Sequence, residues 1–159
     1  MMKVTVIVPA GLKEEYLRQA AAEYEKRLHA YCDLKTVEFK PVRLPENPSS
    51  KEIAAALQKE AEEIGRKIPA NSKTVALCIE GKSLSSIELA KEIGCCADEG
   101  KPVTFLIGSS YGLDESLKQR CDARLSFSDM TFPHQLFRIM LLEQIYRAFR
   151  IHSGAAYHK

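Results

Sequence analysis

The stretch VTFLIGSSYGLD, residues 103–114, joins a continuous apolar run to a turn that contains two glycines. An apolar run of this length that ends in turn residues is typical of a strand buried on both faces. Similar runs occur at residues 3–8 (KVTVIV), 34–39 (LKTVEF), 74–79 (TVALCI) and 123–128 (ARLSFS). Helical patterns alternate with these runs. This alternation predicts an α/β fold, a mostly parallel sheet of about five strands with helices on both faces.

Capping signals set several helix boundaries. S-x-x-E capping boxes begin at Ser49 and Ser85, and Thr131 is expected to cap the last helix, with Pro133 in its first turn. Helices are expected over residues 12–31, 49–68 and 85–100. A short helix that ends near residue 119 and a last helix that begins at residue 131 are also expected. No linker, repeat or low-complexity stretch divides the chain, so we expect a single domain over residues 1–159.

The composition is that of an ordinary globular protein, with 45% hydrophobic and 28% charged residues. The chain has no tract of about 18 apolar residues, and its first apolar run is too short for a signal-peptide core. We therefore expect no membrane span and a cytoplasmic location. The five cysteines are odd in number and show neither CxxC nor Cys/His ligand spacing, which fits a reducing compartment and predicts no metal site.

The last helix is apolar on almost every side and therefore needs cover on every side. One face is expected to lie on the sheet and the other on a second subunit, as in a two-fold homodimer; deeper burial within one chain is the alternative. Arg147 and Arg150 then precede a tail that ends in YHK (residues 157–159), and no acidic residue follows Glu143. Because the net charge is only +2, any basic patch is expected from this end of the chain.

Three predicted strand ends carry residues suited to a ligand: 79–81 (IEG), 107–112 (IGSSYG) and 127–132 (FSDMTF). Ligands of parallel sheets bind beyond the carboxyl ends of the strands. The glycine spacing matches neither the dinucleotide nor the triphosphate motif, so the loop suits some other ligand, with a plain tight turn as the alternative. In FSDMTF, apolar side chains beside short hydroxyls and backbone groups suit an adenine slot, unless the loop merely packs into the core.

Three segments then resemble one known family: SFSDMTFPHQLFRIMLLEQIYRAFRI (126–151) with the closing YHK, IGSSYGLD (107–114) and LCIEGKSLSS (77–86). They resemble the ribosomal RNA large subunit methyltransferase H family of the SPOUT superfamily, over essentially the whole chain. The resemblance implies a homodimer whose C-terminal part is threaded as a trefoil knot, a feature that periodicity does not indicate. It also implies S-adenosylmethionine as the cofactor and methylation of N3 of a pseudouridine in 23S ribosomal RNA, on the assembled ribosome.

By this resemblance, the cofactor contacts fall on the same three strand ends. They are Leu77, Gly108, Phe127, Ser128, Asp129, Met130, Thr131 and Phe132. The family commonly has two glycines after the strand isoleucine, where this chain has Gly108 followed by Ser109. An added Cβ crowds a bound cofactor or resists a positive φ, so we expect a modest adjustment of the site at Ser109.

The resemblance also gives the tail an expected role. The N3 atom of pseudouridine carries a proton, and histidine is the usual proton acceptor near neutral pH. We expect His158 to take this proton and Tyr157 to pack on a base or ribose. Lys159, Arg147 and Arg150 are expected to bind the RNA. Without the resemblance, a frayed end with an incidental histidine is the simpler interpretation.

Three other functions compete with this one. They are a non-catalytic ribosome-binding or assembly factor, a SPOUT methyltransferase acting on transfer RNA, and a nucleotide-binding redox protein that uses Cys95 and Cys96. The complete FSDMTF loop argues against the first, and the lack of an appended RNA-binding module argues against the second. His134 is expected to hydrogen-bond locally at the start of the last helix, and His29 to face solvent on the first.

Overall fold

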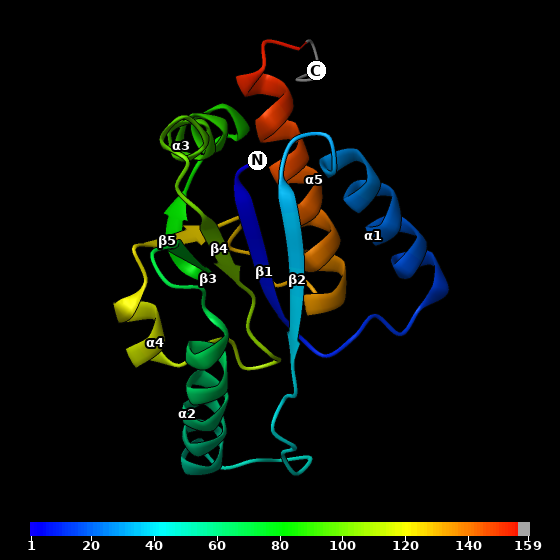
Figure 1. The fold of residues 1–159 in the computed structure, drawn as a ribbon. Coiled ribbons are helices and arrows are strands. Elements are labelled where there is room, and N and C mark those ends of the chain that lie inside the picture. The colour runs from blue at the N-terminus through cyan, green and yellow to red at the C-terminus, as the bar shows by residue number, and fades with distance from the viewer. Residues whose placement is uncertain (156–159) are drawn as a thin grey trace.

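A computed structural model describes residues 1–155, so Tyr157, His158 and Lys159 lie outside the described residues. Five strands alternate with five helices in this part of the chain, as the sequence predicts (Figure 1). In chain order they are β1 (Lys3–Pro9), α1 (Glu15–Leu28), β2 (Asp33–Phe39), α2 (Ser50–Lys67), β3 (Lys73–Ser83), α3 (Ser86–Glu99), β4 (Val103–Leu106), α4 (Glu115–Arg120), β5 (Ala123–Ser126) and α5 (His134–His152).

The strands form one sheet in the order β2-β1-β4-β3-β5, and every neighbouring pair is parallel. The prediction of a parallel α/β sheet of about five strands is therefore confirmed. Both predicted capping boxes are also present, because Ser49 and Ser85 each accept from the backbone N–H three residues later. These two helices begin where the sequence places them.

Helices cover both faces of the sheet, as expected. On one face, alternate residues of β1 (Val4, Val6 and Val8) pack in a cluster with α1, α3 and α5. On the other face, Ile7 packs in a second cluster with residues of α2 and α4. This alternation is the two-residue period of a strand whose two faces are both buried.

β3 differs from its prediction in a way that matters for function. The sequence places its end at Ile79, but the strand continues to Ser83 around a bulge. Leu77 and Lys82 both pair with Leu125 of β5, so residues 78–81 leave the regular ladder. A bulge leaves its extra residues unpaired and changes the direction of their side chains.

α5 differs from its prediction at its start. Thr131 was expected to cap the helix, but the N-cap residue is Pro133, with no side-chain cap hydrogen bond. Pro133 has a φ of −56° and a ψ of 135°, which is not a helical conformation, so the helix begins after it. α5 then packs against α1 and α3 of its own chain, and seven of its residues are buried. Leu136 stays 42% exposed at the start of the helix.

Within residues 1–155, none of the helices combines the length and the apolar character that a membrane span requires.

Candidate functional site

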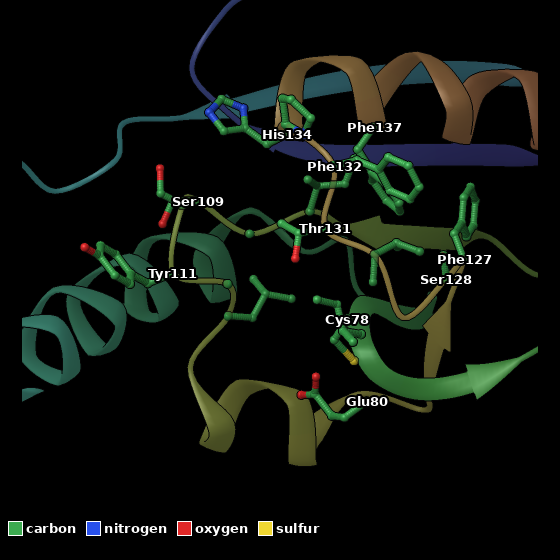
Figure 2. A pocket seen from close by; sticks show the side chains of 18 of the residues that line it. Cys78, Glu80, Ser109, Tyr111, Phe127, Ser128, Thr131, Phe132, His134 and Phe137 are labelled. Atoms are coloured by element: carbon green, nitrogen blue, oxygen red, sulfur yellow. The ribbon is translucent and has the colours of Figure 1, made fainter.

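A cleft of about 730 Å³ lies where the carboxyl ends of β3, β4 and β5 meet. Its walls are residues 77–80, 107–113, 127, 128 and 130–134, with Lys118 from α4 and Phe137 from α5. Figure 2 shows the loops after these strands around one hollow, with Phe127, Phe132 and Phe137 on one side and Cys78 and Glu80 on another. The three strand ends singled out in the sequence therefore form a single site, as the geometry of parallel strands requires.

The loop after β4 is a tight turn that requires glycine at two places. Gly112 has a φ of +85°, a conformation that residues with a Cβ rarely adopt. Gly108 is needed for a different reason: a Cβ on it would lie 2.4 Å from the backbone C and O of Gly112. The N–H of Gly112 donates to the carbonyl oxygen of Ser109 at 2.8 Å and closes the turn. The two backbone segments thus approach each other as closely as glycine permits.

Ser109 stands where the family commonly has a second glycine, and it is accommodated without strain. Its φ is not positive, because the described non-glycine residues with positive φ are Ala10 and Asn71. Its hydroxyl points away from the turn and donates to Oε1 of Glu60 on α2 at 2.7 Å. Glu60 is only 4% exposed, and its second oxygen accepts from the N–H of Val42 at 2.8 Å. At Ser109 the structure therefore has a hydrogen bond from the serine hydroxyl to the buried Glu60 carboxylate.

The FSDMTF loop between β5 and α5 forms the apolar wall. The ring of Phe127 lies 4.8 Å from that of Phe137, measured between centroids, and Phe132 lies 6.4 Å from the same ring. The hydroxyl of Ser128 accepts from the N–H of Met130 at 3.0 Å, which orders the bend. Met130 lines the cleft although it is 73% exposed, so its side chain stands at the rim.

Of the eight residues expected to contact a cofactor, seven line this cleft. They are Leu77, Gly108, Phe127, Ser128, Met130, Thr131 and Phe132. Asp129 is exposed and does not line the cleft, whereas residues 130–132, which follow it, all line it.

The bulge of β3 contributes the polar side of the cleft. Lys118 of α4 forms a short ion pair with Glu80 and a second one with Glu115 at 3.2 Å. The hydrogen bond from Lys118 holds the pKa of Glu80 below its ordinary value, so the carboxylate is charged at neutral pH. The pKa of the Cys78 thiol is raised, first by burial and then by the charge of Glu80, which keeps it protonated. This side of the cleft is therefore an ionic rim with a neutral thiol.

His134 is a cleft residue that the sequence did not indicate. It is half-buried at the first position of α5, and burial, with a smaller effect of Lys13, lowers its pKa. The imidazole is therefore neutral near pH 7 and able to accept a proton. Its position two residues after the FSDMTF loop, with only Pro133 between them, was the signal that could have indicated it. His29 is exposed, as expected.

Arg147 and Arg150 lie near the other end of α5. The guanidinium of Arg147 pairs with Glu143 at 2.7 Å, and a guanidinium N–H of Arg150 donates to the hydroxyl of Tyr31 at 3.3 Å. Thirteen residues separate Arg150 from Phe137, which at 1.5 Å per residue is about 20 Å along the helix axis. Within one chain, the two arginines are therefore remote from the cleft.

The vicinal cysteines also lie elsewhere. Cys95 is exposed and Cys96 is buried on α3, and neither lines the cleft. Burial raises the pKa of Cys96, which disfavours its reactive thiolate. Across residues 1–155, no cluster of three or more His, Cys, Asp or Glu side chains is placed to hold a metal ion.

Comparison with known proteins agrees with the geometry of the cleft. A family model described as "Predicted SPOUT methyltransferase" matches residues 2–158. Proteins named ribosomal RNA large subunit methyltransferase H from Clostridioides difficile (strain 630) and Clostridium botulinum (strain Alaska E43 / Type E3) are each 47% identical to this chain, over 99% of it and 100% of their own length. The chain belongs to this methyltransferase H family. A similar protein from Clostridium perfringens (strain SM101 / Type A), named ribosomal RNA large subunit methyltransferase H 1, is 46% identical over the same shares.

The cleft of this family member lies at the end of the sheet formed by β3, β4 and β5. The segments whose sequences resemble the family are the segments that build its walls. The buried Glu60 is part of the same structure, although it lies outside those segments. Its signal in the sequence was a carboxylate on the apolar stripe of α2, three residues after Leu57 and four before Ile64.

Proposed function

We propose that this protein is an S-adenosylmethionine-dependent enzyme that methylates N3 of a pseudouridine in 23S ribosomal RNA on the assembled ribosome. One observation carries the proposal: seven of the eight residues expected to contact the cofactor line a single cleft. Family membership supports methyl transfer, and the relatives' names refer to RNA of the large ribosomal subunit. We expect the enzyme to work as one domain in the cytoplasm, where ribosomes are, with its C-terminal part threaded as a trefoil knot.

The cleft fits S-adenosylmethionine in size and chemistry. A volume of about 730 Å³ is within the range of small-molecule sites, and its apolar wall suits an adenine ring. At Gly108 a Cβ would lie 2.4 Å from the backbone of Gly112, so only glycine allows the tight turn by which this loop borders the cleft. The residues that would hold the cofactor are Leu77, Gly108 and the loop from Phe127 to Phe132. When bound, S-adenosylmethionine supplies an electrophilic methyl group.

The remaining requirement is a nucleophile with a free lone pair, so the N3 proton of pseudouridine must leave. We propose that His158 accepts it, while Tyr157 packs on the base or ribose and Lys159 binds phosphate. Cations near the base also favour its deprotonated form. His134 is a second neutral imidazole at the cleft, and the experiment must distinguish the two.

The length of α5 bears on which chain supplies the tail. The helix runs from the cleft toward the amino end of β1 (Figure 1). Fifteen residues separate Phe137 from His152, which is about 22 Å along the axis. The six residues from His152 to His158 span at most about 22 Å when fully extended, so the tail could return to Phe137 of its own chain only if it ran straight back along the helix. We therefore propose a homodimer in which the tail of each subunit serves the cleft of its partner. Arg147 and Arg150 would then contact RNA beside the partner's cleft.

The direct test is mass spectrometry of 23S RNA from ribosomes incubated with the protein and labelled S-adenosylmethionine. The wild type is expected to methylate one pseudouridine. His158→Ala and a chain ending at Ala156 are expected to lose this activity and still bind cofactor. His29→Ala is the matched control at an exposed histidine and should behave as the wild type. Loss with His134→Ala alone would assign the base to His134, and RNA binding without any methylation would indicate an assembly factor.

A mixing experiment tests the exchange of tails between subunits. The chain ending at Ala156 keeps an intact cleft, and Gly108→Ala keeps an intact tail. If the tail acts on the partner's cleft, mixed dimers contain one complete site and regain up to about a quarter of the wild-type activity per total subunit, because random pairing makes half of the dimers mixed. If each tail serves its own cleft, every site in the mixture lacks one part and the activity stays at the level of the separate variants.

Transfer RNA as the substrate would show as methylation of that RNA in place of 23S RNA.

A further inference from the structure

The glycine loop after β4 is fixed at its ends, where the N–H of Ile107 donates to the carbonyl oxygen of Ile7 at 2.9 Å and Leu113 is buried, and residues 108–112 lie between these anchors. It lies between Leu106, the last residue of β4, and the start of α4, and it carries Gly108 and Gly112 within five residues. Glycine loses more conformational freedom on ordering than any other residue, so such a loop needs ties to the rest of the fold. Within the loop, the backbone bond from Gly112 to Ser109 closes the turn but does not attach it to its surroundings.

The tie comes from a helix on the opposite face of the sheet from α5. Oε1 of Glu60 accepts from the hydroxyl of Ser109 at 2.7 Å, across 49 positions of sequence. Figure 2 shows the side chain of Ser109 on the loop that borders the cleft. Oε2 of the same carboxylate accepts from the N–H of Val42, in the segment between β2 and α2, at 2.8 Å. One buried side chain thus joins the glycine loop, α2 and the segment after β2.

Burial makes this bridge effective. Glu60 is 4% exposed, and a buried carboxylate that loses a hydrogen-bond partner carries the full cost of its lost hydration. If the loop moves away from Glu60, Oε1 loses its hydrogen bond from the Ser109 hydroxyl. Glycine in place of Ser109 would have no hydroxyl to offer, so the bridge depends on the serine at this position.

We propose that Glu60 is a positioning residue for cofactor binding. Through Ser109 it holds residues 108–112 in the shape that binds S-adenosylmethionine, before the cofactor arrives. The proposal rests on the proposed function only in the identity of the ligand; the ordering of the loop is a property of the free protein. When a binding-competent loop is populated only part of the time, the apparent affinity falls by that fraction.

Two measurements on the full-length protein test the proposal. The first is hydrogen exchange of the free protein, read on peptides that cover residues 108–113. Ser109→Ala and Glu60→Ala are expected to speed exchange in this loop, and Glu62→Gln, an exposed change on the same helix, is expected to leave it unchanged. If hydrogen exchange at residues 108–113 were unchanged in both Ser109→Ala and Glu60→Ala, the proposal would be overturned, whatever the ligand is.

The second measurement is calorimetric binding of S-adenosylhomocysteine, with steady-state methylation of ribosomes. Ser109→Ala is expected to raise the Kd and the cofactor KM roughly five- to twentyfold, with kcat and the ribosome KM unchanged. Glu60→Gln keeps one acceptor and can donate to the Ser109 hydroxyl, so it should retain most of the affinity. A fall in kcat with an unchanged cofactor KM would refute a positioning role. Failure of the wild type to bind S-adenosylhomocysteine would instead refute the proposed function, and the exchange result would still decide the ordering.

Discussion

Gly108→Ala tests whether the cleft depends on the close approach inside the glycine loop. The new Cβ would lie 2.4 Å from the C and O atoms of Gly112, where ordinary contacts begin near 3.4 Å. One backbone segment must therefore move by about 1 Å, since no side chain can move aside in its place. Overpacking of this kind typically costs about 1–3 kcal/mol. For a domain of this size, each kcal/mol lowers Tm by about 2–4 °C, so the expected fall is roughly 2–12 °C.

The same shift should weaken cofactor binding by more than about tenfold, because the backbone of this loop forms one wall of the cleft. Thermal unfolding and calorimetric titration with S-adenosylhomocysteine measure the two effects. Gly65→Ala is the matched control: a Cβ at Gly65 meets nothing within 4 Å, and alanine stabilises a helix by up to about 1 kcal/mol relative to glycine. If Gly108→Ala matched the wild type in both Tm and affinity, the close approach of Gly108 and Gly112 would not be a requirement of the site.

Three further predictions concern stability. Burial lowers the pKa of His134, so as the pH falls this histidine is protonated in the unfolded chain before it is protonated in the folded protein. The stability of the wild type relative to His134→Gln, measured by urea titration, should therefore fall as the pH drops through about 6.5. Gly94→Ala would place a Cβ 2.4 Å from Nδ1 of His152, so this side chain must move, and the stabilisation of about 1 kcal/mol that alanine gives inside a helix should appear in full only when His152→Ala is added; additive effects of the two changes would refute the steric explanation. Hydrogen bonds from Thr74 lower the pKa of Asp122, so the stability advantage of the wild type over Asp122→Ala should be present at pH 7 and disappear as the pH falls below about 4.

The sheet and the place of the cleft could be predicted from the sequence because both depend on local patterns. Continuous apolar runs such as residues 3–8 and 103–106 identify buried strands, and parallel strands bring their carboxyl ends to one edge. The polar and glycine residues that follow three of these strands are therefore brought together at that edge. Ser109 was located through the family resemblance and not through a local pattern; a modest adjustment was expected there, and the structure has a hydrogen bond from its hydroxyl to Glu60.

Features that depend on pairing between distant segments could not be predicted in this way. The bulge of β3 exists because both Leu77 and Lys82 pair with Leu125, a register that no single strand encodes. The start of α5 was missed because Thr131 and Pro133 both carry helix-start signals, and proline prevailed as the N-cap. Asp129 was expected to contact the cofactor as part of a continuous motif, and its side chain lies outside the cleft that the other seven residues line.

The bridge from Glu60 shows why a binding loop can depend on residues far from any motif. A loop that must come close to a ligand is rich in glycine, and glycine gives it freedom that ligand binding would have to remove. A hydrogen bond from Ser109 to a buried carboxylate removes part of that freedom during folding, when α2 packs its Ala61 and Ile64 against the sheet. The affinity of the cleft is then linked to the packing of α2, a helix that does not line the cleft. Substitutions that loosen α2 should therefore weaken cofactor binding before they unfold the protein.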